Sequence, residues 1–289
     1  DIGVSPINYP GYIPVGDEDN RRKLAKLWKV DFEKMPSKPG LTTVEIMHGA
    51  YDGNIKGMYI MGENPMLTDP DLNHTEKALE NLDFLVVQDI FHTETTPFAD
   101  VILPASSFAE KHGTFVNSDR RTLRVRKAVE MPGEAEEDWI ILMKIAERMG
   151  YNLGTYQTAR EIFEEITEAT PIMAGINYDR IKKEGVQWPC PDTNHPGTKT
   201  LFLDQFKTKS GLGILNPVHH SEQKERASKE FPFILNSGRI LYQYHTSTMS
   251  RRNKALTDFA NQSYVLMNPV DLEKYGFQDG DRVRIFNQR

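Results

Sequence analysis

The sequence predicts an α/β protein built on a parallel sheet. Three short apolar segments of strand length follow one another, at Met58–Met61, Phe84–Val87 and Val101–Leu103, and a helix-length segment, Asp71–Leu82, lies between the first two. A strand, a helix and a strand in this order are typical of parallel strands joined by a crossover helix. The segments LVV and VIL are continuously apolar, as expected for parallel strands that are buried on both faces.

The composition limits the possible classes of function. The 289 residues allow one large domain or two ordinary ones, and 38% hydrophobic with 26% charged residues is typical of a soluble globular protein. The formal net charge of −6 provides no basic field for nucleic acid or an anionic membrane. No apolar segment approaches the roughly 18 to 20 residues that cross a bilayer. We therefore expect no nucleic-acid partner, no direct membrane span, and a cytoplasmic location with export left open.

The chain has one cysteine, Cys190, which lies between two prolines in WPCP. A single cysteine excludes an intramolecular disulfide and any Cys-based zinc or iron–sulfur site made by this chain alone. Because reactive cysteines need a neighbouring base or a positive helix end, we interpret Cys190 as a structural or incidental thiol. The adjacent His219 and His220 have no visible third ligand, so we predict no metal site there.

Four further helices are predicted from apolar spacing and capping residues. They are Asp19–Trp28, with Asp17 as its cap, Thr42–Gly49, Glu134–Met149 and Ala159–Ala169. The third has acidic residues in its first turn, where the helix dipole favours them, and an apolar stripe that is expected to face the core. The stripe consists of Trp139, Leu142, Met143, Ala146 and Met149, and Gly150 should end the helix.

Strands are also predicted beyond the parallel sheet. The alternation of residues 122–126 (TLRVR) indicates one strand. Residues 171–228 are rich in Pro, Gly, Asn and His, which indicates a connector with one short strand at Thr200–Leu203. Phe231–Asn236 is expected to be a strand, and the last residues to form a strand, a short helix, a turn and a strand.

Ligands of parallel sheets bind beyond the carboxyl ends of the strands. The polar and turn-forming residues there are Gly62, Glu63, Asn64 and Thr68 after the first strand, and Gln88, Asp89 and Thr93 after the second. A glycine lets a ligand approach the backbone, amides such as Asn64 and Gln88 can read a base edge, and the Asp89 carboxylate suits ribose hydroxyls. The pattern favours a purine nucleotide; the alternative is that GENP and QD are only turn formers and caps.

Several motifs carry a family resemblance. GENP, VVQDIF-x-TET, ADVILPA, AEK-x-GTF-x-N and RR follow one another as in the molybdopterin oxidoreductase family. NYPGY, GVQWPCPDTNHPGT and LNSGRILYQYHTSTMSRR resemble the C-terminal portion of the formate dehydrogenase large (alpha) subunit. The similarity covers nearly the whole chain.

The resemblance implies roles for particular residues. Asp138 would accept hydrogen bonds from the N1–H and amino group of guanine, a pair of donors that adenine lacks, and Lys111 would lie close to the pterin. The loop from SGR to SRR implies further cofactor contacts at Gly238, Arg239, His245, Thr246, Thr248 and Arg251. Some formate dehydrogenases have Val-Arg-Glu where this chain has SGR, and this departure weakens any assignment of substrate chemistry to the loop.

The most basic stretch of the chain has two interpretations. It contains Lys111, Arg120, Arg121, Arg124, Arg126 and Lys127. A solvated charged face explains most runs of this kind. In the family context, the alternative is contact with the pyrophosphates of the cofactor or with a neighbouring electron carrier.

The resemblance also implies a domain organisation and a cofactor. Residues 1–170 would be part of the α/β domain with its dinucleotide-binding-like parallel sheet, 171–228 a connector, and 229–289 the truncated start of a C-terminal β-barrel. The full subunit would hold molybdenum or tungsten between two molybdopterin guanine dinucleotides. The metal-ligating residue and a [4Fe-4S] cluster would lie in an upstream part, so this chain alone is expected to be inactive.

The leading functional hypothesis is formate oxidation to carbon dioxide, with electrons passed to an iron–sulfur or flavin subunit. A nitrate reductase of the same family is the nearest alternative, and GVQWPCP with HPGT favours formate. A cofactor-free structural paralogue, like the iron–sulfur subunit of respiratory NADH dehydrogenase, is a hypothesis of a different class. A nicotinamide dehydrogenase is weakly supported because no G-x-G-x-x-G follows a predicted strand.

Overall fold

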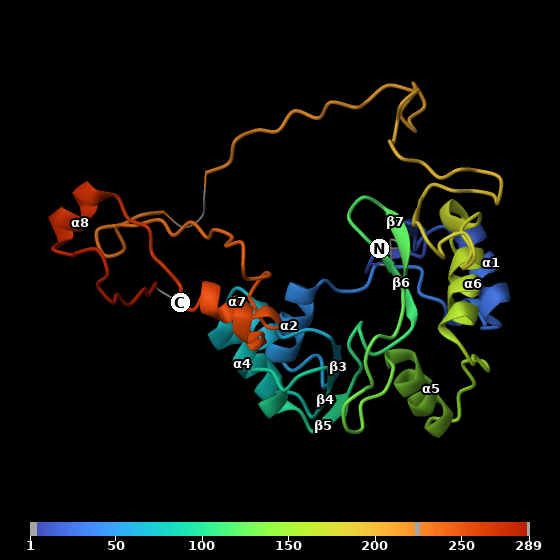
Figure 1. The fold of residues 1–289 in the computed structure, drawn as a ribbon, viewed down its shortest axis with the longest axis horizontal. Helices are drawn as coiled ribbons and strands as arrows, with labels where there is room; N and C mark the ends of the chain where they lie inside the picture. Colours follow the sequence, from blue (N-terminus) through green and yellow to red (C-terminus); the bar gives the residue numbers. More distant parts are fainter. Residues whose placement is uncertain (1–4, 223–225, 288–289) are drawn as a thin grey trace. The chain divides into compact units, whose positions relative to one another are not determined.

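The computed structural model describes residues 5–222 and 226–287, which form two compact units (Figure 1). The first unit comprises residues 5–63, 78–92 and 98–215, and the second comprises residues 64–77, 93–97 and the described residues from 216 onward. Each unit is described by itself below.

The first unit contains the predicted parallel sheet. Its strands are β3 (Gly57–Met61), β4 (Phe84–Asp89) and β5 (Val101–Pro104), in the order β3-β4-β5, and both pairs are parallel. The helix α4 (Leu72–Glu80) comes between β3 and β4 in the sequence, as a crossover requires. The α/β fold class is therefore confirmed.

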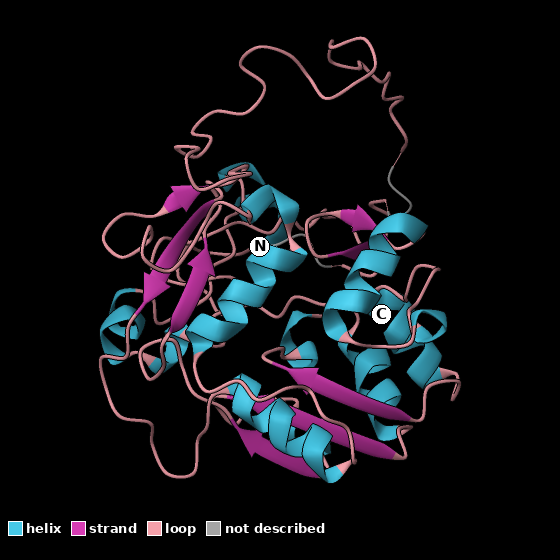
Figure 2. Cartoon of the chain, turned by 90° about the vertical axis from the view of Figure 1, so that its right-hand side faces the viewer, coloured by secondary structure: helices cyan, strands magenta, loops and turns pink. Residues whose placement is uncertain are grey.

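A second sheet of the same unit is antiparallel. It pairs β6 (Gly113–Val116) with β7 (Arg121–Val125), and β7 with β8 (Val186–Gln187). Figure 2 shows the two three-stranded sheets as separate groups of magenta arrows. The strand predicted at 122–126 is confirmed as β7, whereas β6 and β8 were not predicted. A short antiparallel pair, β1 (Asn8–Tyr9) and β2 (Ile13–Pro14), precedes both sheets.

The strand predicted at Thr200–Leu203 is wrong, because these residues form turns and bends. Phe202 has a φ of 58°, in the left-handed region, which a strand does not allow. Its ring stacks on the Phe206 ring with 5.1 Å between the centroids, and this local contact competes with an extended backbone.

Three helices of the first unit agree with their capping signals. The Asp17 side chain caps α1 (Glu18–Trp28), Thr42 and Glu45 form a reciprocal capping box for α2 (Thr43–Tyr51), and Thr158 caps α6 (Ala159–Ala169). The helices α1 and α6 pack together through Leu24, Ala25 and Ala169 (Figure 1). Among the described residues, no helix has the length and apolar character needed to cross a membrane.

The helix α5 (Asp138–Arg148) begins four residues later than predicted. Glu136 instead exchanges backbone hydrogen bonds with the end of β5 and the residues that follow it: its N–H donates to the Pro104 carbonyl, and its carbonyl accepts from Ser106. This pairing holds Glu136 extended, so the helix starts at Asp138. Gly150, with a φ of 74°, follows the helix as predicted.

The predicted apolar stripe of α5 is partly wrong. Ile141 and Ala146 are the buried residues of the helix, whereas Leu142 is exposed and Met149 is 78% exposed. Residue 141 lies about 100° around the helix from residue 142. The side of α5 that faces the core therefore lies next to the predicted stripe and does not coincide with it.

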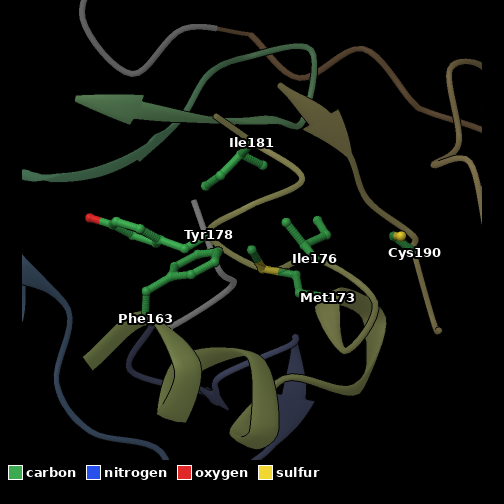
Figure 3. Packing of buried hydrophobic residues seen from close by; sticks show 6 residues of the cluster. All are labelled: Phe163, Met173, Ile176, Tyr178, Ile181 and Cys190. Atoms are coloured by element: carbon green, nitrogen blue, oxygen red, sulfur yellow. The ribbon is translucent and has the colours of Figure 1, made fainter. Parts of the chain in front are cut away.

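A core cluster forms in the first part of the predicted connector. It consists of Phe163, Met173, Ile176, Tyr178, Ile181 and Cys190, whose side chains converge in Figure 3. Cys190 is completely buried within it, which agrees with a structural thiol. Residues near 171–190 thus contribute packed apolar surface, while the predicted boundaries at 170 and 228 stay predictions.

The second unit consists of short helices and extended loops. Its helices are α3 (Pro65–Thr68), η4 (Ser250–Arg252), α7 (Lys254–Phe259) and α8 (Pro269–Tyr275). The helix α8 is the short helix that was predicted near the end of the chain. Within residues 226–287 no strand is formed, so the strand expected at Phe231–Asn236 is wrong. A segment forms a strand only beside a hydrogen-bonding neighbour, and none pairs with it in the described chain. The barrel itself stays a prediction.

Candidate functional site

Asp138 lies at the first residue of α5, and other predicted site residues hold its carboxylate from two sides. Its Oδ1 accepts a hydrogen bond of 2.7 Å from Gln88 Nε2 at the end of β4. Its Oδ2 forms an ion pair with the Lys111 ammonium group. The Asp138 side chain remains 35% exposed. The structure therefore brings Gln88, Lys111 and Asp138 together in the first unit, and we call them, with Tyr59, the carboxylate network.

Gln88 is 0% exposed, and both ends of its amide are used within the chain. Its Nε2 donates to Asp138, and its Oε1 accepts from the Tyr59 hydroxyl. Burial, and secondly the Asp138 charge, raise the pKa of Tyr59, which keeps the hydroxyl protonated as a donor. In this conformation Gln88 has no exposed surface with which to read a base. Its role in the structure is to orient the Asp138 carboxylate through a hydrogen bond.

Lys111 connects the carboxylate network to the backbone of Ser106. Its ammonium also donates to the Ser106 carbonyl oxygen at 3.0 Å. Ser106 is only 2% exposed, and its Oγ has no hydrogen-bond partner in the described part of the chain. Buried polar atoms are normally paired. Ser106 therefore combines a buried, unpaired hydroxyl with a backbone carbonyl that binds Lys111.

A second set of residues meets within the second unit, and we call it the Asn64 clamp. Asn64 Oδ1 accepts from Thr95 Oγ1 at 2.8 Å, and Asn64 Nδ2 donates to Glu94 Oε2 at 2.8 Å and Thr248 Oγ1 at 3.3 Å. Arg251 forms an ion pair with Glu94. The clamp thus joins residues after the first parallel strand, after the second, and in the loop of the SRR motif.

The clamp changes the interpretation of two predicted residues. Asn64 is 3% exposed and its amide is fully engaged, so it fastens chain segments and presents no free edge for a base. Arg251 already has a carboxylate partner. The hydrogen bond from Asn64, followed by the effects of Arg251, lowers the pKa of the Glu94 carboxyl, which therefore stays ionised.

Other residues after the strands act locally. Gly62 has a φ of 65°, and a Cβ there would meet nothing within 4 Å, so its backbone conformation explains the glycine. Asp89 Oδ1 accepts from the backbone of Ile90 and Phe91, as a cap at the end of β4 does. Thr68 Oγ1 donates to the Asn64 carbonyl, and Glu63 is exposed.

The remaining predicted contacts lie on the exposed loop after residue 236. Gly238, Arg239, His245 and Thr246 are exposed. His245 has a φ of 49° and Ser247 a φ of 64°, and both are uncommon for residues with a side chain. Thr248, two residues after Thr246, is half-buried in the Asn64 clamp. The loop therefore has an anchored end at Thr248 and Arg251.

The arginines of the basic stretch mostly bind carbonyl oxygens of the following segment. Arg120 donates to the Trp188, Thr198 and Lys199 carbonyls, Arg121 to Gly185, and Arg126 to Lys182. Arg124 lies 4.2 Å from the Tyr178 ring centroid, a cation–π contact. These four arginines fasten residues 178–199 to β7, so the structure shows a packing role that neither interpretation of the stretch anticipated.

Sequence reasoning did not select Tyr59, Glu94, Thr95 and Ser106 as site residues. Glu94 and Thr95 belong to the TET motif, and that motif was the available signal for them. Tyr59 is a polar aromatic residue in an otherwise apolar strand, but its partner Gln88 depends on the register of β3 and β4. In the described part of the chain, no group of three or more His, Cys, Asp and Glu side chains is arranged to hold a metal ion.

Comparison with known proteins identifies the family. Residues 15–148 match the family model of the molybdopterin oxidoreductases, and residues 233–289 match that of the molybdopterin dinucleotide-binding domain. The chain belongs to the molybdopterin oxidoreductase family. The carboxylate network lies within the first matched segment, and the loop that ends at Arg251 lies within the second.

Relatives in sequence agree with this family, and a solved structure shares the fold. The chain is 47% identical over its whole length to the F420-dependent formate dehydrogenase subunit alpha of Methanocaldococcus jannaschii, of which it covers 42%. It is 35% identical over 97% of its length to the assimilatory nitrate reductase catalytic subunit of Bacillus subtilis, of which it covers 40%. Acetylene hydratase from Pelobacter acetylenicus shares the fold, with a TM-score of 0.66 at 18% identity over 92% of this chain and 38% of the hydratase. The chain spans about two fifths of the length of these proteins.

Proposed function

We propose that the chain is the cofactor-holding part of a formate dehydrogenase that binds molybdopterin guanine dinucleotide with molybdenum or tungsten. The observation that carries the proposal is the carboxylate of Asp138, held by Gln88 and Lys111 and still 35% exposed. The Lys111 side chain, whose ammonium group pairs with this carboxylate, is itself 23% exposed and can reach the same ligand.

The Asp138 carboxylate suits guanine because it offers acceptors only. Gln88 and Lys111 each donate to one of its oxygens, and each oxygen keeps a lone pair for a ligand. The N1–H and amino group of guanine are two adjacent donors that a carboxylate can bind together. Adenine presents no such pair. A cofactor-free scaffold has no use for a carboxylate oriented in this way.

The bound cofactor would supply the redox chemistry that turns formate into carbon dioxide. The residues of this chain bind and orient it. Asp138 holds the base, and Lys111 places positive charge beside it. In the second unit, taken by itself, the exposed residues from Gly238 to Thr246 offer donors for phosphate and pterin groups.

Formate is favoured over nitrate as the substrate because of the identity of the relatives. The formate dehydrogenase subunit is 47% identical and the nitrate reductase 35% identical over nearly the same length of chain. We also propose that the enzyme containing this chain depends on F420, as the formate dehydrogenase of Methanocaldococcus jannaschii does. A nitrate reductase is the second candidate, because a nitrate reductase is still 35% identical over 97% of this chain.

A substrate assay tests the proposal. The enzyme that contains this chain is purified, and formate-dependent reduction of F420 is compared with reduced-dye-dependent nitrate reduction. We expect reduction of F420 with formate, and no nitrate-dependent oxidation of the reduced dye. The protein should release guanosine monophosphate on acid hydrolysis, together with molybdenum or tungsten. Nitrate turnover without formate oxidation contradicts the substrate, and absence of guanosine monophosphate contradicts the cofactor.

A further inference from the structure

Glu94 links three parts of the second unit that are far apart in the sequence. Its Oε2 accepts from Asn64, 30 residues away, and its Oε1 accepts from Arg251, 157 residues away. Asn64 also donates to Thr248, 184 residues away. One carboxylate therefore bridges the residue that follows the first parallel strand and the loop of the SRR motif.

The loop needs an anchor at this end. His245 and Ser247 both have positive φ values, which cost free energy for residues with a side chain and persist only when neighbouring contacts hold them. Inside the loop, Ser250 Oγ donates to Gln243 and accepts from the Tyr244 backbone. These contacts are local, and the Asn64 clamp ties the loop to another segment.

We propose that Glu94 is a positioning residue that fixes residues 246–251 against Asn64, so that the exposed part of the loop is held in one conformation suited to binding the cofactor. It acts through Asn64 and Arg251 and does not touch the cofactor. Arg251 is then an anchor of the loop and not a phosphate ligand. The link to the cofactor rests on the proposed function, whereas the anchoring of the loop does not.

Two substitutions separate the contacts of Glu94, and a control and a double-mutant cycle accompany them. Glu94→Gln keeps an oxygen for Asn64 and removes the ion pair, and Glu94→Ala removes both contacts. Glu273→Gln is the matched control, because Glu273 is an exposed carboxylate on α8 in the same unit. Arg251→Gln is combined with Glu94→Gln to complete a double-mutant cycle.

Hydrogen exchange of the cofactor-free enzyme measures the anchoring. In Glu94→Ala we expect exchange of residues 244–252 to be about tenfold faster or more, because hydrogen bonds from Asn64 and Arg251 to a charged group are lost, with β4 unchanged. Glu94→Gln should give a smaller increase, and adding Arg251→Gln should increase it no further. Unchanged exchange in Glu94→Ala overturns the anchoring.

Cofactor content under limiting cofactor supply measures the effect on binding. We expect lower occupancy in Glu94→Ala than in Glu94→Gln, and wild-type occupancy in Glu273→Gln. Faster exchange with normal occupancy shows a merely structural contact and overturns the positioning role. If the wild-type enzyme itself holds no molybdopterin, the proposed function fails, and the exchange result still decides whether Glu94 anchors the loop.

Discussion

Gln88 shows how a buried amide can serve a site that it does not line. It has no exposed surface, and its donor end and its acceptor end are both fixed by neighbours. Its amide orientation follows from Asp138, because a carboxylate accepts and does not donate. The Tyr59 hydroxyl must then donate to the remaining oxygen.

Tyr59→Phe tests this arrangement. The change leaves Gln88 Oε1 buried without its donor, and an unsatisfied buried acceptor costs about 1 to 3 kcal/mol of the free energy of unfolding. Denaturant unfolding of the two proteins measures the difference. Tyr264→Phe is the matched control, since Tyr264 is exposed. Equal loss in both variants contradicts the buried hydrogen bond.

Glu94 predicts a pH dependence. The pKa of its carboxyl is lower in the folded protein, chiefly through the hydrogen bond from Asn64. Its contribution to stability is therefore complete above the ordinary glutamate pKa, about 4.3, and is lost as the pH falls through the lower folded value. In acid, the unfolding free energy of wild type should fall more steeply than that of Glu94→Gln. If the free energies of unfolding of the two proteins fall in parallel as the pH is lowered, the hydrogen bond between Asn64 and Glu94 is contradicted.

At the scale of elements, stability of the first unit depends on the core cluster around α6. Met173 is 0% exposed, whereas Met149 at the end of α5 is 78% exposed. Met173→Ala should lower the free energy of unfolding by about 2 to 5 kcal/mol, because it leaves a cavity. Met149→Ala should change it by less than about 0.5 kcal/mol. Denaturant unfolding compares the two. A larger loss of free energy of unfolding at Met149 contradicts the finding that this side chain faces away from the core.

The elements that could be predicted are those whose signals are local. The parallel strands and the helices α1 and α6 follow from apolar runs and apolar spacing, and α1 also from its cap at Asp17. The start of α5 and the strand expected at Thr200–Leu203 could not be predicted, because they depend on the pairing of Glu136 with Pro104 and on the stacking of Phe202.

The candidate site was predictable in the same uneven way. Motifs located Asp138, Lys111 and Asn64, but the direction of a side chain at a strand end depends on its neighbours in three dimensions. For this reason Gln88 and Asn64 were expected to read a base and instead orient and fasten the chain.

At the scale of the whole molecule, the chain covers about two fifths of its relatives, and its one cysteine is completely buried. In the proposed enzyme the metal requires a ligand that Cys190 does not offer. The 289-residue chain purified alone should therefore show no formate-dependent dye reduction. Reduction above a buffer blank, with trace enzyme excluded by a denatured control, contradicts this expectation.

The central claim is that Asp138 binds guanine of the cofactor, and Asp138→Asn in the enzyme containing this chain tests it most directly. Guanosine monophosphate and metal per protein are measured under limiting cofactor supply. An amide places a donor against a guanine N–H, so loss of a charged hydrogen bond, about 1.5 to 3 kcal/mol, should lower affinity more than tenfold. The control Asp83→Asn, at an exposed aspartate of the same unit, should keep wild-type occupancy. Full occupancy in Asp138→Asn would contradict the account and leave Asp138 as a helix N-terminal charge paired with Lys111.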